Sequence, residues 1–343
     1  MPVDITATKQ VANTELRLPA LGLGCAHLGE LYRPVPEPIA QATLQAAWDA
    51  GVRYFDTAPW YGRGLSEHRT GGFLRTQPRA DFAITTKVGR VLFRPQDPAT
   101  FDTAPWAGGL PLDLRFDYGY DAIMRSYEDS IQRLALNSID ALLIHDLDAA
   151  QHPEGAMPSL EKALVDSGYR ALDELKRNGH IKAIGMGINT DHALMTTAQL
   201  VDLDFVLVAM PYTLLDQSSL QSGLASCVER GVSVVIGAPF ASGILVTGSG
   251  SDAKYGYVDA PPDVQAKVRG IEAVCAAHGV SLPAAALQFP LAHPAVVSII
   301  PGAMSPDEVR QNVAYLETSI PEAFWRDLKS EGLIHADAPT PAP

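Results

Sequence analysis

Short apolar runs alternate with amphipathic stretches along most of the 343-residue chain. Runs such as VRYFDT (52–57) and DFAITTKVG (81–89) are rich in β-branched and aromatic residues, which predicts buried strands. Stretches such as EPIAQATLQAAWDA (37–50) repeat apolar residues at helical spacing, and the following Gly51 is a typical helix end. Strands are predicted over 18–25, 52–57, 81–89, 139–146, 180–188, 204–210, 232–238 and 295–302. Helices are predicted over 37–50, 66–75, 120–134, 169–178, 191–199, 218–230, 263–278, 281–292 and 306–316.

This order of elements predicts an α/β fold with a parallel sheet, because the strands are continuous apolar runs that suit burial on both faces. A doubly wound open sheet would explain the alternation equally well. The eight strands, with no G-x-G-x-x-G after the first, favour a closed (β/α)8 barrel, or TIM barrel. We expect a single domain over 1–336 and a frayed tail over 337–343.

One connection, residues 89–119, is much longer than the others and is rich in proline, glycine and aromatic residues. It follows the third strand, so in a barrel it would lie at the carboxyl-terminal face, where active sites are found. It is either a surface loop with its own small cluster or a wall of a substrate pocket. We favour the second interpretation, because long ordered loops are usually functional.

The composition narrows the possible partners. Asp and Glu outnumber Lys and Arg by 39 to 26, and the resulting net charge of −13 disfavours binding to nucleic acid or anionic membranes. Cys25, Cys227 and Cys275 form neither a zinc motif nor a disulfide framework. The chain shows no signal-peptide pattern and no membrane-spanning apolar run. We therefore expect a cytoplasmic protein without a metal that acts on a small molecule.

Four ionisable residues lie at or just beyond the carboxyl ends of predicted strands and form a chemically coherent set: Asp56, Tyr61, Lys87 and His145. Each has an ordinary explanation alone, as a turn cap, a solvated side chain or a core histidine. Together they suit proton transfer at a carbonyl or hydroxyl oxygen, because an ammonium lowers the pKa of a nearby tyrosine and a carboxylate holds that ammonium.

The motifs around these residues resemble the aldo-keto reductase superfamily. They are FDTAPWYG (55–62), TTKVG (85–89), LLIHD (142–146) and IPGAMSPDEVRQN (300–312), and the resemblance extends over about 18–316. It implies a (β/α)8 barrel that binds a nicotinamide cofactor. It also implies that Tyr61 exchanges the proton, that Asp56 and Lys87 tune it, and that His145 orients the substrate.

The resemblance implies cofactor contacts as well. Asn189 would hold the nicotinamide carboxamide, although Ile188 and Ala209 stand where the family has a serine and a glutamine. Tyr212 matches a common YxLL element, and Phe240 could replace the tyrosine that stacks on nicotinamide.

At the adenosine end, the positions of the family's usual lysine and arginine carry Gly302 and Glu308. A carboxylate would repel a 2′-phosphate but could accept a hydrogen bond from a ribose hydroxyl, which predicts NAD over NADP. Gln311 and Asn312 would lie on the adenine side.

The segments HLGELYR (27–33), SEHRTGGFLR (66–75) and HDLD (145–148) are most similar to the branch with D-threo-aldose 1-dehydrogenases and pyridoxal 4-dehydrogenases. This implies oxidation of a cyclic hemiacetal to a lactone. We lean to an aldose such as L-fucose, D-arabinose or galactose, with pyridoxal as the alternative and a cofactor-binding regulatory subunit as a weaker one. The oligomeric state stays open. Candidate pocket residues are Cys25, His27, Trp60, Phe93 and Trp106.

Overall fold

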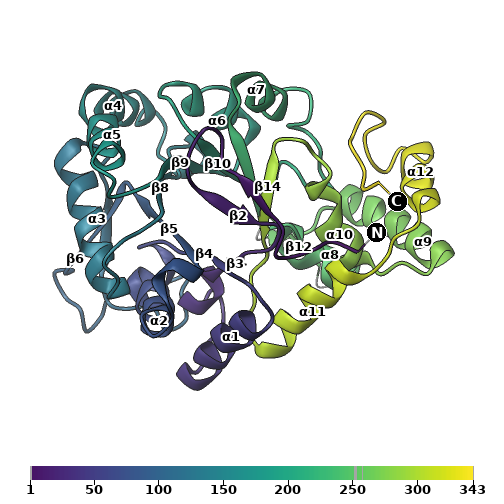
Figure 1. Ribbon diagram of the computed structural model, residues 1–343, viewed down its shortest axis with the longest axis horizontal. Helices are drawn as coiled ribbons and strands as arrows, with labels where there is room; N and C mark the ends of the chain where they lie inside the picture. Colours follow the sequence, from purple (N-terminus) through teal and green to yellow (C-terminus); the bar gives the residue numbers. More distant parts are fainter. Residues whose placement is uncertain (1, 251–252, 257, 343) are drawn as a thin grey trace.

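Eight parallel strands form one closed sheet in the computed structural model, which describes residues 2–250, 253–256 and 258–342. The strands pair in chain order, and single bridges from Leu21 to Ile299 and from Gly24 to Gly302 join the first to the last. The predicted (β/α)8 barrel is therefore confirmed (Figure 1). The strands are β3 (Leu23–Gly24), β4 (Tyr54–Asp56), β5 (Ala83–Val88), β8 (Ala141–His145), β9 (Ala183–Ile188), β10 (Phe205–Ala209), β11 (Ser233–Gly237) and β14 (Val296–Ile300).

The strands are apolar along their length because they separate two cores. Alternate side chains, among them Tyr54, Leu143 and Phe205, pack together as one buried cluster inside the barrel. The hairpin of β1 (Thr8–Gln10) and β2 (Arg17–Pro19) adds Val11, Leu16 and Leu18 to this cluster and crosses one end of the barrel (Figure 1). The remaining strand residues pack outward against the helices.

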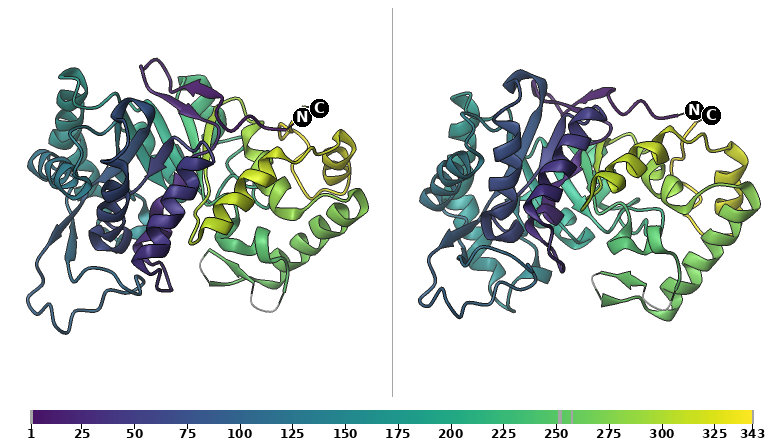
Figure 2. Two further views of the ribbon diagram at one scale, coloured as in Figure 1. Left: turned by 60° about the horizontal axis from the view of Figure 1, so that its bottom comes forward. Right: turned by 90° about the horizontal axis from the view of Figure 1, so that it is seen from below.

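The helices surround the sheet (Figure 2). The prediction of helices was largely correct, whereas three helices, Met157–Ala163, Ile244–Thr247 and Glu322–Ser330, were not predicted. The described helices are α1 (Glu37–Asp49), α2 (Leu65–Leu74), α3 (Tyr120–Leu134), α4 (Met157–Ala163), α5 (Tyr169–Arg177), α6 (Asp191–Met195), α7 (Gly223–Arg230), α8 (Ile244–Thr247), α9 (Pro262–His278), α10 (Leu282–Leu291), α11 (Pro306–Glu317) and α12 (Glu322–Ser330).

The first predicted strand, 18–25, was wrong as a single element. Its start belongs to the β1–β2 hairpin, and only Leu23–Gly24 pairs within the barrel. Between them the backbone passes close to the barrel interior, since a Cβ at Gly22 would lie 2.6 Å from the Tyr54 ring. Apolar character alone does not distinguish the two halves.

The long connection after β5 is ordered and folds back over the barrel mouth. It begins with β6 (Arg90–Phe93), which pairs antiparallel with β7 (Asp113–Phe116). Between these strands, the carbonyl oxygen of Pro105 accepts a hydrogen bond from the Tyr32 backbone N–H at 3.0 Å, and Ala107 N–H donates to the Glu30 carbonyl oxygen at 2.8 Å. Figure 2 shows the connection, in blue, standing out from the barrel.

The chain end packs beyond the predicted boundary at 336. Ala338 is fully buried, and Gln221 Nε2 donates to the Asp337 carboxylate at 3.1 Å. The first residues of the predicted frayed tail are thus held against the barrel.

Within the described ranges, no single helix is long and apolar enough to cross a membrane. The pair α9 and α10 meets that criterion only jointly, and it bends by 100°.

A buried carboxylate fixes α2, which directly follows Tyr61. Glu67 is fully buried, and its two oxygens accept hydrogen bonds from Thr86 Oγ1 at 2.7 Å and from Arg133 Nε at 2.5 Å. Helix α2 is therefore tied to both β5 and α3. The same helix approaches α3 closely at Gly71, where a Cβ would lie 2.0 Å from the Leu134 carbonyl oxygen.

Two neighbouring glycines of α2 test this close approach. We expect Gly71→Ala to lower the free energy of unfolding by about 2 kcal/mol, because the methyl group overlaps the α3 backbone. The matched control is Gly72→Ala, where a Cβ has no neighbour within 4 Å. It should raise the free energy of unfolding by about 0.5 kcal/mol through helix propensity. Urea unfolding of both variants measures the difference, and equal effects would contradict the packing.

Candidate active site

The carboxyl ends of the barrel strands surround a cavity of about 660 Å³, within the range of small-molecule and cofactor sites. Asp56 enters it from the end of β4, Lys87 from β5 and His145 from β8. Tyr61 enters from the 3-10 turn Tyr61–Gly64 that follows β4. The four residues singled out in the sequence therefore meet at one place.

A buried ion pair fixes Lys87. Its ammonium donates to Asp56 Oδ2 at 2.7 Å and to the Thr57 carbonyl oxygen at 2.8 Å, while Thr85 Oγ1 donates to Asp56 Oδ1 at 2.7 Å. Burial alone would lower the pKa of Lys87, but Asp56 and Tyr61 outweigh it and raise that pKa. Lys87 is therefore a permanent cation at this site.

Tyr61 lies against this cation, with the Lys87 ammonium 4.5 Å from its ring centre. Burial raises the pKa of the Tyr61 hydroxyl to about 12, although Lys87 lowers it. The sequence-based expectation of a lowered pKa considered only the ammonium. Burial has the larger effect, so the phenol is protonated at neutral pH and its phenolate form increases with rising pH.

His145 is neutral. Burial lowers the pKa of its imidazole well below the usual range, and Arg90 and Lys87 lower it further. Its Nδ1 has no hydrogen-bond partner among the described residues, and its Nε2 lies 3.3 Å from Asp146 Oδ2. A neutral imidazole can donate one hydrogen bond to a substrate oxygen.

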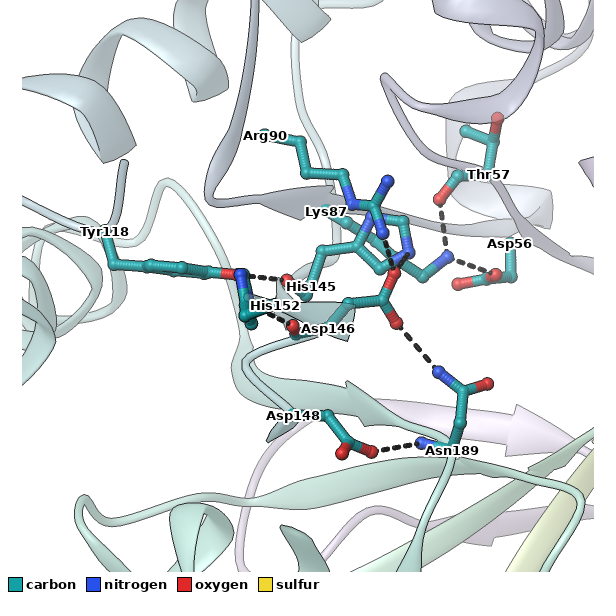
Figure 3. A network of polar contacts seen from close by, with 10 residues as sticks. All are labelled: Asp56, Thr57, Lys87, Arg90, Tyr118, His145, Asp146, Asp148, His152 and Asn189. Atoms are coloured by element: carbon teal, nitrogen blue, oxygen red, sulfur yellow. Dashed lines mark hydrogen bonds and ion pairs between the residues drawn. The ribbon is translucent and has the colours of Figure 1, made fainter. Parts of the chain in front are cut away.

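Three charged residues that the sequence analysis did not single out complete the network in Figure 3. The Asp146 carboxylate pairs with the Arg90 guanidinium through Oδ2 and accepts a hydrogen bond from Asn189 Nδ2 through Oδ1 at 3.0 Å. Asp148 Oδ2 accepts hydrogen bonds from the Asn189 backbone N–H at 3.3 Å and from Thr190 Oγ1 at 2.9 Å. The motif HDLD (145–148) contains both aspartates and could have indicated them, but in the sequence it served only to identify similar proteins.

Two aromatic side chains from outside the barrel hold the end of β8. Tyr118 donates its hydroxyl to the His145 carbonyl oxygen at 2.8 Å, and His152 Nε2 lies 2.8 Å from the Asp146 carbonyl oxygen. Gly89 makes room for this contact, because a Cβ there would lie 2.2 Å from the Tyr118 ring. The backbone carrying His145 and Asp146 is therefore fixed from both sides.

The residues predicted for the cofactor mostly line the same cavity. Glycines at the strand ends leave space beside them, and the lining extends from Lys87 to the first turns of α11. This arrangement fits an extended nicotinamide cofactor. The predicted cofactor residues along it are Asn189, Phe240, Gly302, Glu308, Gln311 and Asn312.

At the α11 end of the cavity, the contacts of His27 and Glu308 set the local charge. A Cβ at Gly302 would lie 2.2 Å from His27 Nδ1, so His27 occupies the space of a side chain at position 302. Burial lowers the pKa of His27, which favours a neutral ring. Glu308 accepts a hydrogen bond from the Met304 N–H at 2.7 Å and lies 3.4 Å from the exposed Arg33 guanidinium.

On the substrate side, Trp60 and Trp106 line the cavity and meet edge to face, with ring centres 5.4 Å apart. Trp106 comes from the long connection after β5, which therefore forms a wall of the cavity.

Three predicted site residues do not line the cavity. Tyr212 is buried against the rings of Phe289 and His293, with centres 5.5 Å and 5.3 Å away. Cys25 is fully buried below the mouth, and Phe93 ends β6 opposite Asp113. In the part of the chain that the structure describes, no group of three or more His, Cys, Asp or Glu side chains could hold a metal ion.

Comparisons with known proteins identify the family of this chain. The model of the aldo/keto reductase family matches residues 20–331. A pyridoxal 4-dehydrogenase from Microbacterium luteolum is 42% identical over 97% of this chain and 100% of its own. A D-threo-aldose 1-dehydrogenase from a Pseudomonas species is 40% identical over 95% of this chain and 96% of its own.

The fold also matches a solved structure. An aldo-keto reductase from Bacillus halodurans in its holo form has a TM-score of 0.74 at 24% identity, covering 97% of this chain and 98% of that chain. The chain belongs to the aldo-keto reductase family, whose members are oxidoreductases that use nicotinamide cofactors.

Proposed function

We propose that this enzyme is an NAD-dependent dehydrogenase that oxidises the cyclic hemiacetal form of an aldose, such as L-fucose, D-arabinose or galactose, to its lactone. The main support for this proposal is that Tyr61, Lys87 and His145 meet in a cavity that extends to α11. The similarity to D-threo-aldose 1-dehydrogenase supports the substrate class. Pyridoxal, oxidised to 4-pyridoxolactone, is the second candidate, favoured by the similarity to pyridoxal 4-dehydrogenase.

In this mechanism the Tyr61 phenolate accepts the proton of the hemiacetal hydroxyl. Lys87, held by Asp56, stabilises that phenolate, and the neutral His145 donates a hydrogen bond to the substrate oxygen. Two electrons and one hydrogen leave the hemiacetal carbon as hydride while the lactone carbonyl forms. When bound, the nicotinamide ring supplies the acceptor for that hydride.

Asn189 is suited to hold the nicotinamide carboxamide. Asp146 accepts one N–H of its side-chain amide and Asp148 accepts its backbone N–H, so the second amide N–H and the amide oxygen remain for the carboxamide. This fixed orientation supports the role of Asn189 although Ile188 and Ala209 lack polar groups.

We also propose that NAD is preferred over NADP. The Glu308 carboxylate lines the cavity beside the adenosine end and pairs with Arg33. A 2′-phosphate would be repelled by this carboxylate, whereas a ribose hydroxyl could donate a hydrogen bond to it.

A panel of L-fucose, D-arabinose, galactose and pyridoxal with NAD, followed as NADH absorbance, tests the function. We expect NADH with at least one aldose. Tyr61→Phe should lower turnover by about 100- to 10,000-fold but leave NAD binding nearly unchanged, because only the proton acceptor is lost. The control Tyr120→Phe removes a hydroxyl on α3 that donates to Glu174, and it should keep the native rate.

Two outcomes of the panel would contradict the proposal. NADH from pyridoxal alone would establish the second candidate. NAD binding without NADH from any compound would instead indicate a regulatory, cofactor-binding protein.

Oxidation should accelerate with rising pH. Because the pKa of Tyr61 is about 12, its reactive phenolate increases by about tenfold per pH unit throughout the range from neutral to alkaline pH. His145 does not titrate in that pH range, since its pKa lies well below the usual range, so it does not counteract this rise in rate. Single-turnover measurement of hydride transfer at several pH values from neutral upward checks this slope, and a flat profile would refute Tyr61 as the proton acceptor.

Glu308→Gln should weaken the preference for NAD. The substitution removes the charge that repels a 2′-phosphate and releases Arg33, so the ratio of kcat/KM for NAD to that for NADP should fall by about fivefold. Glu322→Gln, an exposed glutamate in the first turn of α12, is the matched control. Tighter productive binding of NADP than NAD by the unmodified enzyme would contradict the assignment.

A further inference from the structure

Asp146 and His145 are consecutive residues, yet both side chains line the cavity. Consecutive side chains of a strand point to opposite faces of the sheet, so a regular β8 would direct Asp146 away from the mouth. The backbone of Asp146 instead has a φ of +51°, in the left-handed region. This turn brings both side chains to the same side (Figure 3), and strain of this kind is concentrated at functional sites.

Stability does not explain the charge pair that Asp146 forms with Arg90. The two residues are only 8% and 5% exposed, and the Arg90 guanidinium lies 4.8 Å from the ring centres of both Trp60 and Phe116. A buried ion pair in such surroundings returns little or no more stability than apolar residues would. The pair instead holds the Asp146 carboxylate in place at the wall of the cavity.

The Asp146 carboxylate retains capacity to bind a ligand. Its two oxygens have about four acceptor positions, and the neighbouring protein groups are Arg90 and His145 Nε2 on Oδ2 and Asn189 on Oδ1, which leaves capacity on Oδ1. Because Asp146 lines the cavity, the remaining acceptor positions are available to a donor on the substrate.

The distance between His145 and Asp146 limits how far the Asp146 carboxylate can lie from the reacting oxygen of the substrate. The reacting oxygen has to lie within about 3.2 Å of His145 Nε2 to receive its hydrogen bond. Since Asp146 Oδ2 lies 3.3 Å from the same nitrogen, it is no more than about 6.5 Å from the reacting oxygen. A hydroxyl on the carbon next to the hemiacetal carbon is the nearest substrate donor to the reacting oxygen, so it can lie between that oxygen and the carboxylate.

We propose that Asp146 accepts a hydrogen bond from the substrate hydroxyl next to the hemiacetal carbon, while Arg90 holds the carboxylate in place. In an aldose this is the C2 hydroxyl, whereas the corresponding carbon of pyridoxal belongs to the ring and carries none. Asp146 is thus a specificity-determining residue for aldoses with a C2 hydroxyl, because a charged group left without its partner discriminates strongly. This inference rests on the proposed aldose dehydrogenase function.

A substrate and residue cycle tests the contact. D-arabinose and 2-deoxy-D-ribose differ only in the C2 hydroxyl, and each is assayed with the native enzyme and with Asp146→Asn. For the native enzyme, loss of the hydroxyl should lower kcat/KM by about 30-fold. Asp146→Asn should lower kcat/KM for D-arabinose by about 10-fold more than it lowers kcat/KM for 2-deoxy-D-ribose, because only D-arabinose loses a hydrogen bond to the carboxylate.

The cycle also controls for folding and for an indirect role. Urea unfolding of Asp146→Asn checks that the variant folds, and Asp173→Asn, which removes an exposed charge on α5, should leave the rates on both sugars unaffected. If Asp146 acts only by holding Asn189, both sugars lose the same factor and the KM for NAD rises, which overturns the inference alone. Failure of every aldose in the panel overturns the proposed function as well.

Discussion

The contact between the Lys87 ammonium and the Asp56 carboxylate is the interaction on which the site depends. Neither charge can be removed without leaving the other isolated inside the barrel, which would be strongly destabilising. The parallel register pairs Asp56 with Thr85, and Lys87 follows two residues later on the same face of β5. The ammonium can therefore reach back to Asp56 and remain beside Tyr61, so the pairing of two strands fixes the cation next to the proposed proton-transfer group.

The cavity carries a second buried pair, Arg90 with Asp146, on the other side of His145. Each pair has one cation and one anion, so the mouth contains strong hydrogen-bonding groups while its local charges balance. His145 lies between the two cations and is kept neutral by burial and by their charges. The two balanced pairs are consistent with the proposed uncharged polar substrate.

The parts of the structure that follow local patterns could be predicted from the sequence. The barrel, its main helices and the meeting of Asp56, Tyr61, Lys87 and His145 follow from periodicity and from the parallel direction of the strands. The role of Asp146 could not be predicted, because strand alternation directs it away from the cavity and only the left-handed turn reverses that. The position of Arg90 could not be predicted without knowing how the long connection folds. Tyr212 was misplaced, because a short motif does not reveal which face of its loop packs into the core.

The α11 end of the cavity shows why coenzyme preference is coupled to the fold. A side chain at position 302 would overlap His27, so a basic residue cannot be introduced there unless His27 also changes. Glu308 has a structural contact besides its charge, because its carboxylate accepts the Met304 N–H at the start of α11, where Ser305 caps the helix. The proposed preference for NAD is therefore coupled to packing, because basic residues at positions 302 and 308 would overlap His27 and remove the hydrogen bond to the Met304 N–H.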